Sequence, residues 1–409
     1  MTKIPLTRRT FLRGAGAAFA APYVITSTAL GAEGRPPASE RITMAGIGMG
    51  GRGSGDLRSF MNFPEVQVLA VCDVRRGARD GIKRHVDGKY KNSDCVAYND
   101  FRDVVERDDI DAVVCGTPDH WHALVTIAAM KHGKDVFCEK PLSLTIKEGR
   151  AMVQAARRYA RVFSCGSQRV LGDYGGLARK VQKGELGQIH ICYCDPGGPP
   201  RPCNLPGQDC PPDIDWNLWL GPAPWAPYNA FRCGRAYGLG GKGFRTWRDY
   251  SGGMMTDWGG HKFGGAMFAL GLDLTGPTEI IPPDGKDVKA LTYKFACGVE
   301  MYVTGGGPKY EAAKGSVPGL TWEPPKHLLE RDYQGKGGLP GDALHCFKTR
   351  EKPFRDVEYA HRVATVCHLG NIAYELKRPL KWDPAKEEFP GDDEANRMTW
   401  RPMREPWRI

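Results

Sequence analysis

Short apolar runs alternate with segments of helical periodicity between residues 41 and 166. Strands are expected at residues 42–45, 66–72, 112–115, 136–138 and 162–165, with helices between them. One helix is expected to follow the glycine-rich segment 46–51 and to end near Phe60. Two others are expected over about 121–132 and 145–160. Strands that alternate with helices predict right-handed βαβ units and a parallel, doubly wound sheet. Residues 38–166 are therefore expected to form a Rossmann-type α/β domain that binds a dinucleotide.

The second half of the chain has a different pattern, and residues 167–409 are expected to form a second α/β domain. Strands are predicted at residues 189–194, 279–281, 288–295 and 299–303, in an order typical of antiparallel pairing. Residues 195–250 are rich in Pro, Gly and Trp and form an expected insertion, since long irregular stretches in compact domains are usually functional. A helix is expected over about 360–376, followed by an extended C-terminal arm.

The N-terminus predicts an export signal. Arg8 and Arg9 stand in the run TRRTFLR, and an apolar stretch from about 15 to 25 follows. This stretch is interrupted by Pro22 and is too short for a stable bilayer span. Residues 1–32 are thus expected to be a twin-arginine signal peptide, with a periplasmic or other extracytoplasmic mature protein. An amphipathic N-terminal helix with incidental arginines is the alternative.

Charge and cysteine usage narrow the possible partners. The formal charge is +10, but four basic residues and no acidic residue lie in 1–32, so the mature value is about +6. The remaining basic residues are scattered, so a small-molecule substrate is expected and nucleic-acid binding is not. None of the 13 cysteines forms a CxxC pair, and no metal site is predicted. The sequence does not decide whether two of Cys203, Cys210 and Cys233 form a disulfide.

A glycine-rich turn follows the first strand. Gly46, Gly48 and Gly51 form GxGxxG: the first allows a tight turn, the second lets the backbone approach a pyrophosphate, and the third lets helix and strand pack closely. The motif alone is weak evidence in a chain with 52 glycines. Asp73, however, ends the second strand, where a carboxylate reaches the adenosine ribose. NAD is the expected cofactor, while Arg75 leaves NADP open through possible contact with a 2′-phosphate.

A candidate catalytic lysine ends another strand. Lys140 lies between Glu139 and Pro141, at the edge of the sheet where open α/β folds bind ligands. Thr117 and Pro118 end the neighbouring strand and are expected to form a wall beside the nicotinamide. His120 and His122 follow and are candidates for ligand contact, although structural roles are the commoner outcome. A surface lysine is the alternative for Lys140.

Asp257 and His261 are a candidate acid–base pair. They are four residues apart, which on one helix places both side chains on the same face. Histidine suits proton removal from a hydroxyl near neutral pH, so an acid limb in the ordinary histidine range is expected. Asp257 is expected to bind a substrate hydroxyl or to orient the site.

In this order, the glycine turn, the strand-end aspartate, TPDHWH, EKP and DxxxH resemble the glucose–fructose oxidoreductase and inositol dehydrogenase (Gfo/Idh/MocA) family over nearly the whole mature chain. The resemblance implies a C-terminal α/β domain with a large, open, mostly antiparallel sheet, and a homo-oligomer is expected. It implies catalytic roles for Lys140, Asp257 and His261. Many members carry an aspartate where this chain has Gly264, so the substrate cannot be carried over. The expected cofactor-binding residues are Gly46, Gly48, Gly51, Asp73, Arg75, Thr117, Pro118, His122, Glu139 and Lys140.

The resulting hypothesis is an exported NAD(P)-dependent oxidoreductase that moves a hydride between nicotinamide and a hydroxyl-bearing carbon of a sugar, polyol or sugar acid. One alternative is an enzyme that retains its nucleotide, for sugar dismutation or redox-assisted glycoside cleavage. A sugar-binding or sensing protein is the non-enzymatic alternative. The particular sugar and the particular hydroxyl stay open.

Overall fold

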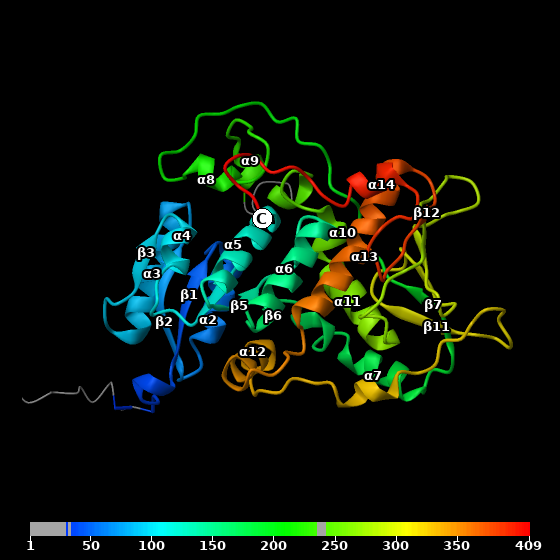
Figure 1. Ribbon diagram of the computed structural model, residues 1–409, viewed down its shortest axis with the longest axis horizontal. Coiled ribbons are helices and arrows are strands. Elements are labelled where there is room, and N and C mark those ends of the chain that lie inside the picture. The colour runs from blue at the N-terminus through cyan, green and yellow to red at the C-terminus, as the bar shows by residue number, and fades with distance from the viewer. Residues whose placement is uncertain (1–29, 32–33, 235–242) are drawn as a thin grey trace, which may run out of the picture.

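The computed structural model describes residues 30–31, 34–234 and 243–409. The predicted twin-arginine motif lies outside the described residues. Two six-stranded sheets lie at opposite ends of the molecule, with a layer of helices between them (Figure 1).

The N-terminal sheet is entirely parallel, with strand order β3-β2-β1-β4-β5-β6. Its strands are Ile42–Ile47 (β1), Val66–Cys72 (β2), Val96–Tyr98 (β3), Ala112–Cys115 (β4), Asp135–Cys138 (β5) and Phe163–Cys165 (β6). The helices that connect and cover them are Gly51–Phe60 (α2), Arg76–Tyr90 (α3), Phe101–Val105 (α4), Asp119–Lys131 (α5) and Ile146–Arg158 (α6). The predicted doubly wound sheet is confirmed; β3, α3 and α4 are additions to the predicted elements.

The second sheet is mixed, with order β11-β7-β10-β9-β8-β12. Only β10 and β7 pair in parallel; the other neighbours are antiparallel. The strands are Ile189–Tyr193 (β7), Glu279–Ile281 (β8), Thr292–Lys294 (β9), Glu300–Tyr302 (β10), Lys309–Ala312 (β11) and Leu380–Lys381 (β12). The helices are Gly175–Lys183 (α7), Gly253–Asp257 (α10), Gly259–Leu270 (α11), Gly338–Thr349 (α12), Val357–Leu376 (α13) and Asp393–Arg397 (α14). The strand predicted over 288–295 was too long, because only its last part pairs.

The helix α13 ties the two sheets together. Ala360 and Ala364 pack in the same hydrophobic cluster as the Rossmann strands, while Val363 and Cys367 pack with the second sheet and α11. Its buried surface therefore faces both sheets at once, which explains why it is apolar along most of its length. This shared packing fixes the position of one sheet relative to the other.

The predicted insertion folds over the Rossmann sheet. It contains Trp216–Leu220 (α8) and Ala230–Cys233 (α9), and its aromatic side chains form a small cluster of their own. The C-terminal arm crosses the top of the molecule to α5 (Figure 1). There Trp407 packs edge-on against Trp121, with the two ring centroids 4.7 Å apart. Four 3₁₀ turns complete the described elements: Ala38–Glu40, Gln168–Val170, Gly243–Thr246 and Lys326–Glu330. Within the described residues, no helix combines the length and apolar character that a membrane span requires.

Candidate active site

The glycine turn has the geometry of a dinucleotide site, but its third critical glycine is not the predicted one. Gly48 has φ +78°, and a Cβ there would lie 2.4 Å from the Thr117 nitrogen. A Cβ at Gly51 would meet nothing within 4 Å, whereas one at Gly53 would lie 2.1 Å from the Gly48 oxygen. The close approach of helix and strand therefore depends on Gly53 packed against Gly116. The assignment of that role to Gly51 was wrong; Gly51 begins α2 and lines the cleft.

Gly53→Ala is expected to damage folding and nucleotide binding, because the new methyl group meets backbone atoms that cannot move aside. A loss of about 1–3 kcal/mol in unfolding free energy is expected from such overpacking. Gly55→Ala is a matched control on the same helix: its Cβ would meet nothing within 4 Å. That variant should gain up to about 1 kcal/mol. Denaturant unfolding compares the two, and equal stabilities would contradict the packing role of Gly53.

A cleft of about 900 Å³ runs from this turn across the carboxyl edge of the sheet. Nearly all the predicted cofactor-binding residues line it: Gly48, Gly51, Asp73, Arg75, Thr117, Pro118, Glu139 and Lys140. The insertion supplies further walls through Trp219, Phe244 and Arg245. The cleft has the size and the glycine cradle that a dinucleotide requires. Gly46 lies beneath the turn, where a Cβ would meet the Met49 sulfur at 2.5 Å.

Asp73 and Arg75 lie at the end of the cleft formed by β2. Asp73 Oδ1 accepts a hydrogen bond of 2.8 Å from the Arg75 backbone nitrogen. Burial raises the pKa of Asp73 to about 6, against the opposing effect of that hydrogen bond. The Arg75 guanidinium donates to the Cys233 sulfur at 2.9 Å, so it faces the insertion. Asp73 is therefore ionised at neutral pH and can accept hydrogen bonds from ribose hydroxyls.

NAD affinity should fall on acidification, because protonation below the Asp73 pKa removes a hydrogen-bond acceptor for the ribose. Between pH 7 and pH 5 the expected loss is up to about tenfold. Asp73→Asn should bind NAD weakly at both values, and Asp73→Ser should narrow the preference for NAD over NADP. Calorimetric titration of nucleotide-free protein measures both effects. Tighter binding of NADP than NAD to the unaltered protein would assign cofactor choice to the nearby arginines instead.

Lys140 and Asp257 meet at the other end of the cleft. Lys140 Nζ lies 2.7 Å from Asp257 Oδ1 and 3.0 Å from its backbone oxygen. Arg245, from the insertion, donates to the same carboxylate oxygen at 2.8 Å. Burial alone would raise the pKa of Asp257, but Lys140 and Arg245 hold it below its usual value. The Lys140–Pro141 peptide bond is cis. Two cationic side chains, Lys140 and Arg245, thus pair with the single buried carboxylate of Asp257.

His261 lies beside this pair, and its environment differs from the one expected. The side chain is 3% exposed, and within the described residues its Nδ1 has no hydrogen-bond partner. Burial, Lys140 and Arg169 lower its pKa to about 2. The imidazole is therefore neutral at every working pH. The sequence does not reveal burial beside two cations and therefore predicts an acid limb near the usual histidine pKa, whereas the lowered pKa predicts that this limb is absent.

Asp257 and His261 do not share one regular helix. Asp257 ends α10 and His261 lies in the first turn of α11, with Trp258 between the two helices. The His261 nitrogen bonds to the Trp258 oxygen instead of continuing the i−4 ladder to Asp257. The predicted spacing nevertheless brings both groups close to Lys140, through a break that lets Asp257 face that lysine.

His120 and His122 are enclosed by protein and are not candidates for a replacement base. His120 Nε2 lies 3.1 Å from the Trp219 oxygen, and burial lowers its pKa to about 4. His122 Nδ1 lies 2.7 Å from the Pro141 oxygen, and its Nε2 lies 2.9 Å from the Thr117 oxygen. The prediction of His122 as a cofactor contact is corrected: its side chain is 1% exposed. It clamps the two loops that carry Thr117 and Lys140.

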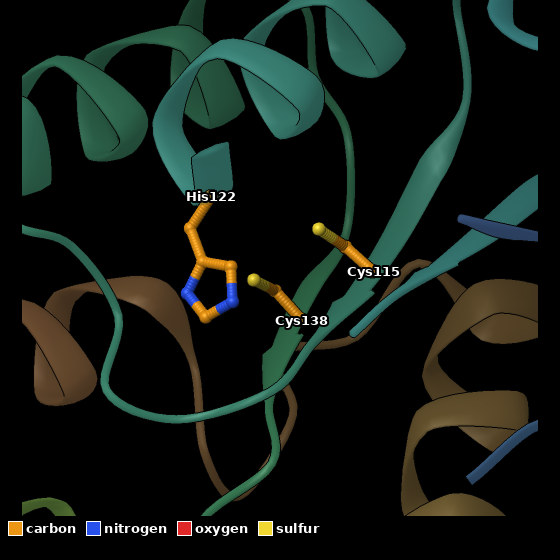
Figure 2. Close-up of side chains that lie close together, drawn as sticks. All are labelled: Cys115, His122 and Cys138. Atoms are coloured by element: carbon orange, nitrogen blue, oxygen red, sulfur yellow. The ribbon is translucent and has the colours of Figure 1, made fainter. Parts of the chain in front are cut away.

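Figure 2 shows that His122 also points toward two cysteines. Cys115 and Cys138 are register partners at the ends of β4 and β5, and the three potential ligand atoms lie within 4.8 Å of one another. The sequence did not indicate this group, because its members come from separate elements. Since both ring nitrogens already face carbonyl oxygens, a metal ion would have to displace one of them. We interpret the cluster as packing that fixes the two loops.

A carboxyl pair beneath the glycine turn was also missed. Arg52 Nε lies 3.0 Å from Glu139 Oε1, and its guanidinium also pairs with Asp56 at 2.8 Å. Burial and the adjacent Glu139 raise the pKa of Asp56 to about 8. Glu139 is therefore held by Arg52 at the edge of the cleft, directly before Lys140.

All thirteen cysteines are free, including Cys203, Cys210 and Cys233, so the disulfide considered for that region is not formed.

Comparisons with known protein families match both domains of the chain. The profile for the oxidoreductase family NAD-binding Rossmann fold matches residues 41–167, and the profile for the C-terminal alpha/beta domain of the same family matches 202–409. A glycosyl hydrolase family 109 protein from Shewanella baltica is 32% identical over 169 residues, which cover 37% of each chain. The match thus spans little more than a third of that relative.

Two solved structures share the fold at low sequence identity. Myo-inositol 2-dehydrogenase from Lactobacillus plantarum is 16% identical with a TM-score of 0.56, covering 83% of this chain and 99% of that one. Aldose-aldose oxidoreductase from Caulobacter crescentus is also 16% identical, with a TM-score of 0.52 and the same coverage. At this identity the likeness concerns the fold alone. Because the C-terminal profile matches half of the chain and the Rossmann profile matches most of the rest, the protein belongs to the Gfo/Idh/MocA family of oxidoreductases.

Proposed function

We propose that the protein transfers a hydride between NAD and a hydroxyl-bearing carbon of a sugar, polyol or sugar acid. The observation that carries this proposal is that Lys140, which lines the dinucleotide cleft, pairs with Asp257 at 2.7 Å and lies close enough to the buried His261 to lower its pKa. NAD, when bound, supplies the hydride acceptor. The proposal includes export by the twin-arginine pathway, which the run around Arg8 and Arg9 supports, and leaves NADP as a second possible cofactor.

The roles of the three side chains follow from their charges. The Lys140 ammonium donates to the substrate oxygen and stabilises the negative charge that develops there. The neutral His261 imidazole accepts the hydroxyl proton. Its low pKa makes it a weak base at rest, but negative charge on the adjacent oxygen raises its proton affinity during the reaction. Asp257 holds Lys140 in place and keeps a buried acceptor for a second substrate hydroxyl.

A direct test mixes the nucleotide-loaded protein with a panel of sugars, polyols and sugar acids and follows reduced nicotinamide by absorbance. At least one compound should reduce the nucleotide, and Lys140→Ala should suppress that signal. If no member of the panel reacts while NAD is bound, the assignment to carbinol oxidation fails.

A specific set of contacts favours the alternative in which the nucleotide is retained through turnover. The insertion pairs with the chain just after β2, through a bridge between Arg75 and Ile214. This is the end of the cleft where Asp73 would contact the adenosine ribose. The Arg76 nitrogen donates to the Asp213 oxygen at 2.8 Å, and the Asp215 nitrogen donates to the Val74 oxygen at 2.9 Å. These bonds hold the insertion against the β2 end of the cleft. Scarcity of free NAD outside the cytoplasm supports the same alternative. The name of the Shewanella relative, a glycosyl hydrolase, fits the glycoside-cleavage form of it.

Dialysis distinguishes exchange from retention. With retention, native protein dialysed extensively and then denatured releases NAD in proportion to protein, and substrate conversion needs no added nucleotide. Mass spectrometry identifies both the nucleotide and any sugar released. Nucleotide-free protein that turns over only with added NAD would remove the retained-nucleotide alternative and leave an ordinary dehydrogenase.

A further inference from the structure

The most unusual charge in the described protein is Arg355, in the loop between α12 and α13. Its side chain is completely buried, and within the described residues none of its three nitrogens has a hydrogen-bond partner. A guanidinium stays protonated in proteins and carries five N–H donors. A buried charge without a partner is strongly unfavourable, so such groups are ordinarily paired. Arg355 therefore needs an anion that the protein itself does not place beside it.

A small cavity adjoins this guanidinium. It offers about 10 Å³ of space, which is close to the volume required by one water-sized occupant. Its wall includes Arg355, Lys140, Ser167, Thr256 and Gly260. Two of the described residues that line it are cationic, and none is acidic. The cavity is thus small, and the only charged residues in its described wall are cationic.

The neighbouring acidic groups are already engaged. Asp273 pairs with Arg331 at 2.7 Å, and Asp257 pairs with Lys140 and Arg245. Cys165 lines the cavity, but burial raises the pKa of its thiol to about 11 even with Arg355 nearby, so it stays neutral. No described side chain in the wall thus supplies the missing negative charge.

The gap beside Arg355 results partly from a glycine. Gly264 lies in α11, and a Cβ built on it would lie 3.6 Å from Arg355 Nη2 and 2.9 Å from a Val170 methyl group. A side chain at this position would therefore meet the guanidinium. An acidic residue there would neutralise it, and the glycine leaves it open.

We infer that this cavity is a binding site for a single halide ion, chloride under ordinary conditions, held by Arg355 behind Lys140. A monatomic anion fits a space for one water-sized occupant and supplies the charge that a water molecule does not. Larger anions such as sulfate or a substrate carboxylate exceed the volume. The site is separate from the nucleotide cleft and shares only the Lys140 side chain with it. This inference stands independently of the proposed reaction.

Bromide replaces chloride as a probe with an anomalous diffraction signal. Crystals of the mature protein grown or soaked in sodium bromide should show one buried anomalous peak in contact with the Arg355 guanidinium. The measurement uses unaltered protein, so it does not depend on whether any variant folds. A buried water at that place without anomalous signal, or no occupant, would overturn the inference.

Thermal unfolding gives a second measurement in solution. At constant ionic strength, replacing gluconate by chloride or bromide should raise the melting temperature by roughly 2–5 °C. Gly264→Asp should abolish this dependence, because the new carboxylate takes the place of the ion. Arg355→Met should abolish it as well. Arg232→Met is the matched control, since Arg232 is equally buried but donates to Tyr250 and to the Leu205 oxygen. Halide dependence that survives in Arg355→Met would contradict the assignment.

Discussion

Lys140→Ala is expected to lower turnover by about 10²-fold or more while nucleotide affinity changes little. The variant loses the lysine that pairs with the Asp257 carboxylate, and with it the charge that stabilises the substrate oxygen in the transition state. The site should not collapse, because Arg245 still pairs with Asp257 at 2.8 Å. Single-turnover reduction of bound NAD measures the chemical step, and calorimetric titration measures nucleotide affinity separately.

Lys262→Ala is a matched control for this experiment. Lys262 lies on α11 next to His261, but its ammonium donates to the backbone oxygens of Asp195 and Gly306 and not to the catalytic pair. Its removal should leave the chemical step within a few-fold of the unaltered protein. Equal turnover in Lys140→Ala and Lys262→Ala would remove Lys140 from the mechanism.

Most of the fold was predictable because its local signals agree with one another. Apolar strands of three to seven residues, separated by helical periods and a glycine turn, admit few arrangements other than a parallel sheet. The elements that were missed have weak signals of their own. The strand β3 has only three residues, and α12 packs beside α2 on one face of the Rossmann sheet through a contact that no local pattern reveals.

Site residues could be predicted from the sequence only where a recognisable motif also fixes their place on the backbone, such as the end of a parallel strand. The strand-end positions of Asp73 and Lys140 follow from the parallel sheet, so both were placed correctly at the cleft. Arg245 was missed, because it reaches Asp257 from an insertion whose path the sequence does not determine. Gly53 was missed because GxGxxG spacing was satisfied by Gly51. Only the distances between α2 and β4 show which glycine makes the close contact.

His261→Asn is expected to slow oxidation by about 10²–10⁴-fold without changing the shape of the acid side of the pH profile. Burial, Lys140 and Arg169 lower the His261 pKa to about 2, so the neutral form dominates from pH 8 down to pH 5. The unaltered protein should therefore show no acid limb from this residue over that range. The rate should be measured with NAD bound to saturation, because protonation of Asp73 near pH 6 affects binding.

Two further variants assign whatever pH dependence is observed. The Asp56 carboxyl, whose pKa is about 8, lies next to Glu139 and close to Lys140, so a limb near pH 8 should disappear in Asp56→Asn and persist in His261→Asn. Asp257→Asn should reduce the rate at every pH, since it releases Lys140 instead of removing a base. An acid limb near pH 6.5 in the saturated, unaltered protein that vanishes in His261→Asn would show that His261 titrates normally. In that case the cations beside it do not set its charge state, and the neutral-base mechanism loses its physical basis.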